Sequence, residues 1–399
     1  MANYEFADLV GDEKVFFTEY FNKKPMLRKN AVPGDPRDIL SLRRLDELVN
    51  LEVVRPPYIK VNLKGDGVPE QGYTRDVVVQ GQTITDAVEP EKIYELFRAG
   101  ATVTWCSLNQ FDARLRDFTR VISEKMAVRT DSVAFLTPTG KKGYPPHHDP
   151  VDLFIVQLEG TKHWKLWNPP AVRLGDNAQY TLEGLGEPEI EVSLTPGDVL
   201  YLPYGTPHAA AAEGKASLHL SVMMRPRMWK DLLRETFDEL VAGEGFDEFD
   251  TFPYIGELRD DSVESAFKDK VRALVARLEA VDPVSELDRL ADVGRHLDGS
   301  SSGRTFETIA AMDDLGPDAR LRRGRAPLEF GQNENGRTQM TVNGHKIAVP
   351  TPIAETLAAL GPDASITASH VFPGVDERRS TKAAQGLTRL GVFEVAAAG

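Results

Sequence analysis

Residues 145–167 read PPHHDPVDLFIVQLEGTKHWKLW, and this stretch decides how the chain is expected to fold. Two runs rich in apolar residues, 151–158 and 162–167, flank the turn-forming residues 159–161, which predicts two short antiparallel strands joined by a tight turn. Similar short runs separated by turn residues continue from Ser132 to about Met224. We therefore expect an antiparallel β-sandwich or barrel in the middle of this chain.

Two motifs inside this strand-rich segment contain metal-ligating residue types. His147 and Asp149 stand two residues apart, so in a strand their side chains point to the same face. The second motif, 196–208, reads PGDVLYLPYGTPH, in which a turn, a strand and a bend precede His208. Two histidines and one carboxylate leave coordination positions open, as iron(II) oxygen chemistry requires, whereas a closed zinc site needs a fourth ligand. We predict a metal site of these three residues; the alternative is a pair of hydrogen-bonded core histidines.

A polar strand face and a lysine accompany the predicted metal site. Along residues 217–222, apolar side chains on one face alternate with Ser217, His219 and Ser221 on the other. Buried hydroxyls and imidazoles cost free energy unless something pairs with them, and a bound dicarboxylate would be such a partner. We expect Lys162 to supply a point charge, and Ser221 a hydrogen bond, to the distal carboxylate of that ligand.

Taken together, the motifs resemble the JmjC-type cupins of the ribosomal oxygenase family. The residues that carry the resemblance are 134–138, 145–149, 154–164, 196–208 and 217–221. The resemblance implies an α+β protein with a double-stranded β-helix core, that is, a jelly-roll cupin of the JmjC type. It also implies Fe(II), the co-substrate 2-oxoglutarate and O2.

The resemblance assigns roles to five residues. His147, Asp149 and His208 would hold the iron, and Lys162 with Ser221 would hold the distal carboxylate of 2-oxoglutarate. The implied reaction is hydroxylation of a peptidyl side-chain carbon of the arginine or histidine type, with succinate and CO2 as co-products. The implied substrate is a peptide or protein, in particular a ribosomal protein.

The chain departs from the family pattern near the co-substrate. Family members often carry Asn and Tyr at the positions of Val133 and Phe135, so two polar groups are missing here. Residues 209–215 read as a short alanine-rich loop after His208. These departures leave two alternatives open: a hydroxylase of a biosynthetic peptide or small metabolite, and a non-catalytic metal-binding cupin module.

After Pro226 the apolar periodicity becomes helical. Three apolar stripes between 229 and 297 predict a small helical bundle with surface for a partner subunit, and we expect a homodimer. The tail combines helices with a hairpin signal at Asn343-Gly344 and resembles a winged helix. The run 299–303, Gly-Ser-Ser-Ser-Gly, reads as a linker. The predicted domains are therefore an oxygenase domain at 1–225, a helical dimerisation domain at 226–304 and a winged-helix-like domain at 305–399.

Composition excludes several function classes. The 399 residues are 41% hydrophobic and 27% charged, as in a globular protein. The net charge of −14 argues against a protein whose main role is to bind nucleic acid or an anionic membrane surface. The arginines of the tail at Arg320, Arg322, Arg323 and Arg325 read as a solvated loop, and we expect no direct nucleic-acid binding. The single cysteine, Cys106, excludes an internal disulfide. With no apolar run of about 18 residues and no leader at Met-Ala-Asn-Tyr-Glu, we expect no membrane association and a cytoplasmic location.

Overall fold

The computed structural model describes residues 4–51, 53–141, 144–172, 175–176, 178–242, 246, 261–295 and 303–396. The chain divides into two compact units, Met1–Arg295 and His296–Gly399, each with its own hydrophobic core. The predicted linker at 299–303 lies outside the described residues except for Gly303. Within the described ranges, no helix combines the length and the apolar character that a membrane crossing requires.

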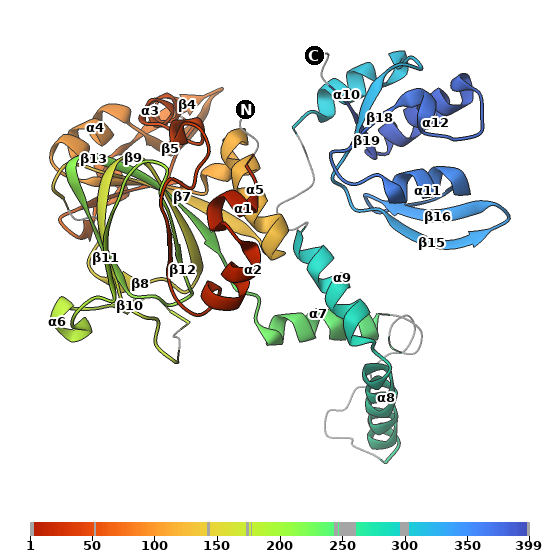
Figure 1. The fold of residues 1–399 in the computed structure, drawn as a ribbon, viewed down its shortest axis with the longest axis horizontal. Coiled ribbons are helices and arrows are strands. Elements are labelled where there is room, and N and C mark those ends of the chain that lie inside the picture. The colour runs from red at the N-terminus through yellow and green to blue at the C-terminus, as the bar shows by residue number, and fades with distance from the viewer. Residues whose placement is uncertain are drawn as a thin grey trace. The chain divides into compact units, whose positions relative to one another are not determined.

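Antiparallel strands of the larger unit form the predicted two-layered sandwich (Figure 1). One layer has the strand order β1-β12-β9-β13-β7-β6-β2-β3. In the other layer, β11 pairs with the second half of β9, and β8 pairs with β10 and with the start of β13. The strands are β1 Met26–Arg28, β2 Ile59–Leu63, β3 Asp66–Gly67, β6 Thr102–Cys106, β7 Thr130–Thr137, β8 His147–His148, β9 Asp152–Leu166, β10 Ala178–Gln179, β11 Ile190–Leu194, β12 Val199–Leu202 and β13 His208–Met224, with a separate hairpin of β4 Thr74–Val79 and β5 Gln82–Val88.

The two longest strands, β9 and β13, pair along nearly their whole lengths and belong to both layers. The register between the two strands shifts twice in β13, between Glu213 and Leu218 and between Leu218 and His219. At the bend of β9, Gly160 has φ +67°, and a Cβ added there would lie 2.1 Å from the carbonyl oxygen of Ala216. The predicted pair of strands joined by a turn at 159–161 is therefore wrong, because these residues stay in one bent strand.

The expected loop after His208 is also wrong. Residues 209–213 pair with residues 165–161 of β9, so the alanine-rich stretch is the first part of β13. Alanine gives no apolar and polar alternation, which is why the sequence pattern did not indicate a strand there.

Alternate side chains of β9 and β12 face two different cores. Those on the outer face pack beneath the N-terminal helices, as Phe154, Val156 and Tyr201 do. Those on the inner face meet side chains of the second layer in a smaller core, which consists of Leu153, Ile155, Trp164, Leu166, Leu194, Leu200 and Leu202. The polar side chains described below lie beside this smaller core, between the two layers.

Helices cover the outer face of the sandwich (Figure 1). Helix α5 begins at Ala113, because the Asp112 carboxylate accepts hydrogen bonds from the amides of Arg114 and Leu115 and caps the helix. The helical elements are α1 Phe6–Val10, α2 Glu13–Val15, η1 Phe16–Tyr20, η2 Pro36–Asp38, α3 Leu42–Val49, η3 Glu70–Gly72, α4 Pro90–Arg98, η4 Leu108–Gln110, α5 Ala113–Met126 and α6 Leu182–Leu185.

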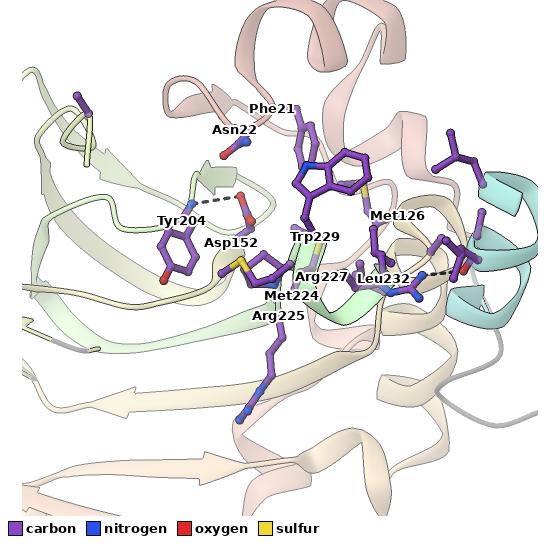
Figure 2. Close-up of a pocket in the computed structure, with 18 residues that line it drawn as sticks. Phe21, Asn22, Met126, Asp152, Tyr204, Met224, Arg225, Arg227, Trp229 and Leu232 are labelled. Carbon is purple, nitrogen blue, oxygen red and sulfur yellow. Dashed lines mark hydrogen bonds between the residues drawn. The ribbon is translucent and has the colours of Figure 1, made fainter. Parts of the chain in front are cut away.

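Three longer helices follow the sandwich in the same unit: α7 Trp229–Val241, α8 Asp261–Glu279 and α9 Pro283–Arg295. A groove lies where α7 and α9 meet the sandwich, and Figure 2 shows Trp229 on its wall with Phe21 and Met126. Trp229 is 72% exposed, and Leu233, Phe237 and Leu287 are exposed as well. The helices thus present a largely unburied apolar face.

The described residues of the smaller unit, 303–396, form two three-stranded sheets, three α-helices and two short 3-10 helices. The hairpin signal at Asn343-Gly344 is confirmed, since β16 and β17 pair on either side of it. The solvated loop predicted at the arginines is wrong: residues 320–323 form a strand, Arg322 Nη2 lies 2.6 Å from Glu394 Oε2, and buried Arg323 donates to the carbonyl of Ala326. The elements are α10 Thr305–Ala311, η5 Met312–Asp314, β14 Arg320–Arg323, β15 Glu329–Glu334, β16 Arg337–Val342, β17 His345–Pro350, α11 Thr351–Ala359, β18 Ser365–Thr367, η6 Ala368–His370, α12 Glu377–Arg389 and β19 Phe393–Val395.

Candidate active site

The structure brings the three predicted metal ligands together between the two layers. His147 lies on β8, Asp149 follows that strand directly, and His208 begins β13 opposite His147. The Nε2 atoms of His147 and His208 lie 3.8 Å and 3.9 Å from Oδ2 of Asp149. One potential ligand atom from each residue lies within 4.8 Å of the other two, a spacing suited to one shared ion.

Backbone carbonyls orient both imidazoles. His147 Nδ1 lies 2.8 Å from the carbonyl oxygen of Pro145, and His208 Nδ1 lies 3.0 Å from that of Thr206. Because a carbonyl can only accept, each Nδ1 carries the proton, and each Nε2 keeps its lone pair facing Asp149. The two histidines are therefore fixed in the tautomer that a metal would need.

Burial favours the neutral form of one of these imidazoles. Desolvation, with a smaller contribution from the neighbouring His147, lowers the pKa of His208 to about 4. At neutral pH this ring therefore offers a lone pair rather than a positive charge.

Neither of the two nearby histidines joins the cluster. His148 alternates to the other face of β8, where Nδ1 is 2.6 Å from the hydroxyl of Tyr180 and Nε2 is 2.8 Å from the carbonyl of Asp176. His163 points away from the interior and pairs with Glu191 at 2.8 Å. Alternation along the strands accounts for both positions.

A cavity next to the three residues contains the predicted dicarboxylate-binding side chains. Lys162 and Ser221 both line it and are 3% and 5% exposed. Lys162 Nζ lies 3.2 Å from Thr137 Oγ1 and 3.3 Å from His219 Nδ1, and no carboxylate of the described residues forms an ion pair with it. Burial therefore lowers the pKa of the Lys162 ammonium to about 7.

Sequence reasoning placed His219 on the polar strand face without giving it a role, and it did not assign Thr137 or Trp164 to the site. Trp164 and His219 line the cavity, and Thr137 is a neutral acceptor for Lys162. The indole Nε1–H of Trp164 is buried and has no hydrogen-bond partner among the described residues. The signal available for Trp164 and His219 was their spacing of two residues from Lys162 and Ser221, which puts each on the same strand face as its neighbour.

The two positions that depart from the family pattern lie on β7, opposite β13. Phe135 lines the cavity and pairs in register with His219, while Val133 is buried and pairs with Ser221. The cavity wall is apolar at Phe135.

Comparisons with known proteins agree with this geometry. Residues 108–232 match the JmjC domain family. The chain is 34% identical over 220 residues to ribosomal oxygenase 1 of Bos taurus, covering 51% of this chain and 32% of that protein. It is 27% identical over 307 residues to the bifunctional lysine-specific demethylase and histidyl-hydroxylase NO66 of Aedes aegypti, covering 70% of this chain and 46% of that protein. The chain thus spans about a third to a half of the length of these relatives.

Solved structures show a shared fold over nearly the whole chain. The X-ray structure of E. coli ycfD matches with a TM-score of 0.57 at 18% identity, covering 99% of this chain and 100% of that one. A structure of YcfD in complex with cobalt and 2-oxoglutarate matches with a TM-score of 0.54 at 19% identity, covering 98% and 99%. These findings show that residues 108–232 resemble the JmjC domain, that the chain is similar in sequence to ribosomal oxygenase 1 and NO66, and that it shares its fold with YcfD.

Proposed function

We propose that this chain is an iron(II)- and 2-oxoglutarate-dependent oxygenase that hydroxylates a peptidyl side chain of the arginine or histidine type, in a ribosomal protein. Succinate and CO2 are the co-products. One observation carries the proposal: a His, Asp, His cluster adjoins a cavity that contains a buried ammonium without a carboxylate partner among the described residues. The cluster suits a divalent metal, and the ammonium suits an anionic ligand.

The donor set fits iron(II). Two neutral imidazoles with free Nε2 lone pairs and one carboxylate supply three ligands, and a six-coordinate ion would keep three positions open. His147, Asp149 and His208 hold the iron in this proposal, and the bound iron supplies the activation of O2. The carbonyls of Pro145 and Thr206 keep the imidazoles in the ligating tautomer.

The cavity fits a dicarboxylate such as 2-oxoglutarate. Lys162 of β9 binds and orients the distal carboxylate, and Ser221 of β13 adds a hydroxyl donor in the same cavity. The Nε1–H of Trp164, which has no partner within the described ranges, is a further donor, since a buried donor left without an acceptor costs free energy that a ligand oxygen would recover. Leu153 and Ile155 form apolar walls that exclude water from the bound ligand.

The test is anaerobic reconstitution of the full chain with iron(II) and 2-oxoglutarate, followed by addition of O2 and measurement of succinate. We expect succinate from the wild type and from His163→Ala, whose imidazole faces outward, and none from Asp149→Ala. Mass spectrometry of ribosomal proteins would then detect the added oxygen atom on Arg or His. Metal binding without succinate, even with a broad extract of basic proteins, would refute the oxygenase and favour a non-catalytic module.

The same assay addresses the other enzymatic alternative. Phe135 makes part of the cavity wall apolar, which is compatible with a substrate other than a ribosomal protein. Succinate formation that depends on a small metabolite or a biosynthetic peptide, with ribosomal proteins left unmodified, would favour that alternative.

We also propose that α7 to α9 form the dimerisation domain and that the tail is winged-helix-like. The groove of Figure 2 and the exposed apolar side chains of α7 support a second copy of this chain as the partner. Sedimentation equilibrium would test this: Trp229→Glu should dissociate the dimer, whereas Val79→Glu, at another exposed apolar position, should not. A monomeric wild type would contradict the proposal.

A further inference from the structure

Within the part of the chain that the structure describes, the Lys162 ammonium has two hydrogen-bond acceptors, which leaves one N–H for a ligand. It carries three donors, of which one points to Thr137 Oγ1 at 3.2 Å and one to His219 Nδ1 at 3.3 Å. Both acceptors belong to neighbouring strands, β7 and β13, so the ammonium is fixed from two sides. Its remaining donor is available to an anion in the cavity that Lys162 lines.

The contact between Lys162 Nζ and His219 Nδ1 defines the tautomer of His219. If Nδ1 accepts from the ammonium, the ring proton is on Nε2, and the neutral imidazole becomes a donor at that atom. Burial and the adjacent Lys162 lower the pKa of His219 well below its usual value, so the ring stays neutral. No hydrogen bond to Nε2 is found among the described residues, although His219 is only 3% exposed.

Aromatic neighbours hold the imidazole in place. The ring of Phe135 stacks on His219 with centroids 4.9 Å apart and an interplanar angle of 5°. Trp164 meets it edge-on at 5.4 Å. Neither aromatic ring supplies a hydrogen-bond acceptor for Nε2, and all three side chains line the cavity, so we infer that a ligand in the cavity is the acceptor of this N–H.

We propose that His219 is a further co-substrate-binding residue, which donates from Nε2–H to the distal carboxylate while its Nδ1 orients the Lys162 ammonium toward the same group. The inference rests on the proposed function, because it takes 2-oxoglutarate as the ligand. A carboxylate has two oxygens, and adjacent donors on Lys162 and His219 can each address one of them.

The experiment is isothermal titration calorimetry on the full chain loaded with Mn(II), using 2-oxoglutarate and 2-oxobutyrate, which lacks the distal carboxylate. Three variants separate the two ring nitrogens. His219→Leu removes both, His219→Asn retains a polar group near the Nδ1 position, and His219→Gln retains a donor near the Nε2 position. We expect the Leu and Asn variants to bind 2-oxoglutarate about 10- to 100-fold more weakly, the loss typical of a hydrogen bond to a charged group. The Gln variant should stay within a few-fold of the wild type, and 2-oxobutyrate should bind all four proteins alike.

Other outcomes overturn the inference in distinguishable ways. Equal weakening of both ligands would show that His219 has only a structural role. Wild-type affinity in the Asn variant would restrict His219 to positioning Lys162. If the wild type itself binds the two ligands equally, the proposed function fails together with the inference, whereas a preference for 2-oxoglutarate that survives in His219→Leu overturns the inference alone.

Discussion

Substituting Gly160 by alanine should destabilise the protein much more than the same change at Gly214, the glycine in the corresponding part of the partner strand. Both residues have left-handed backbone angles, φ +67° and +65°, so both variants incur the same backbone strain of about 1 kcal/mol. They differ in their surroundings. A Cβ on Gly160 would lie 2.1 Å from the Ala216 carbonyl oxygen, whereas a Cβ on Gly214 meets nothing within 4 Å.

The carbonyl oxygen of Ala216 would have to move by about 1.3 Å to reach ordinary van der Waals distance, and it belongs to β13, one of the two strands that join the layers. Overpacking of this kind costs about 1 to 3 kcal/mol. We therefore expect a free energy of unfolding lower by about 3 kcal/mol for Gly160→Ala and by about 1 kcal/mol for Gly214→Ala, measured by urea titration of tryptophan fluorescence. Equal losses in the two variants would refute the idea that the close approach at Gly160 maintains the bend.

Three further predictions concern the site and its supports. Lys162→Met should abolish 2-oxoglutarate binding. In the absence of ligand it should nevertheless raise the free energy of unfolding by a few kcal/mol at pH 7. The reason is that the lysine side chain, whose pKa is near 10.5 in the unfolded protein, is protonated there, whereas burial in the folded protein disfavours the proton. The difference in free energy of unfolding between this variant and the wild type should be largest below about pH 7 and should decrease as the pH rises toward 10.5. A difference that does not depend on pH would contradict the prediction. Asp198→Asn should cost about 2 kcal/mol at pH 7, since Asp198 accepts hydrogen bonds from Lys29 and from backbone amides, and the loss should shrink below pH 4 in urea titrations. His147→Gln should weaken Mn(II) binding at least about tenfold, whereas His148→Gln should leave it unchanged in the same calorimetric titration.

The pH dependence expected for Asp198→Asn follows from two opposing influences on the pKa of Asp198. Burial alone would raise the pKa of this carboxyl, but hydrogen bonds from Lys29, Thr195 and Asn30 outweigh it and lower the pKa below its usual value. The carboxylate therefore stabilises the folded state above the unfolded pKa, and that contribution is lost as the pH falls through the folded value. The Asp of the Pro-Gly-Asp turn thus anchors the segment after β1 to the start of β12.

The parts of the site that depend on strand alternation could be predicted from the sequence. His147 with Asp149, and the face that Ser221 shares with His219, need only a period of two, and the structure brings the three metal-ligand candidates together. Their roles as ligands remain predictions. The contact between Lys162 and His219 could not be predicted, because it depends on the register shifts of β13 against β9.

Two errors have a common physical origin in long-range contacts. Glycine is a residue typical of turns, yet the pairing of Glu159 and Thr161 with β13 keeps Gly160 inside a strand. The charged segment around Arg322 is typical of a loop, yet Arg322 pairs with Glu394, 72 positions away, and this pairing allows the segment to form a strand of a sheet. In both cases tertiary pairing overrides the local preference. Such pairing between distant segments cannot be seen in a single sequence.

The buried lysine is the feature that separates an enzyme from a metal-binding module. A His, Asp, His cluster serves either, because a module also needs to hold its ion. A buried ammonium whose neighbours are two neutral acceptors and aromatic rings lowers stability and has no use in a structural site. An anionic ligand in the cavity removes that cost, since its carboxylate restores a counter-charge and keeps the ammonium protonated. The affinity of the wild type for 2-oxoglutarate should therefore fall as the pH rises above about 7. The affinity for 2-oxobutyrate, which has no distal carboxylate, should not show that decline. Parallel pH profiles for the two ligands would mean that the buried position of Lys162 has no function in binding the co-substrate.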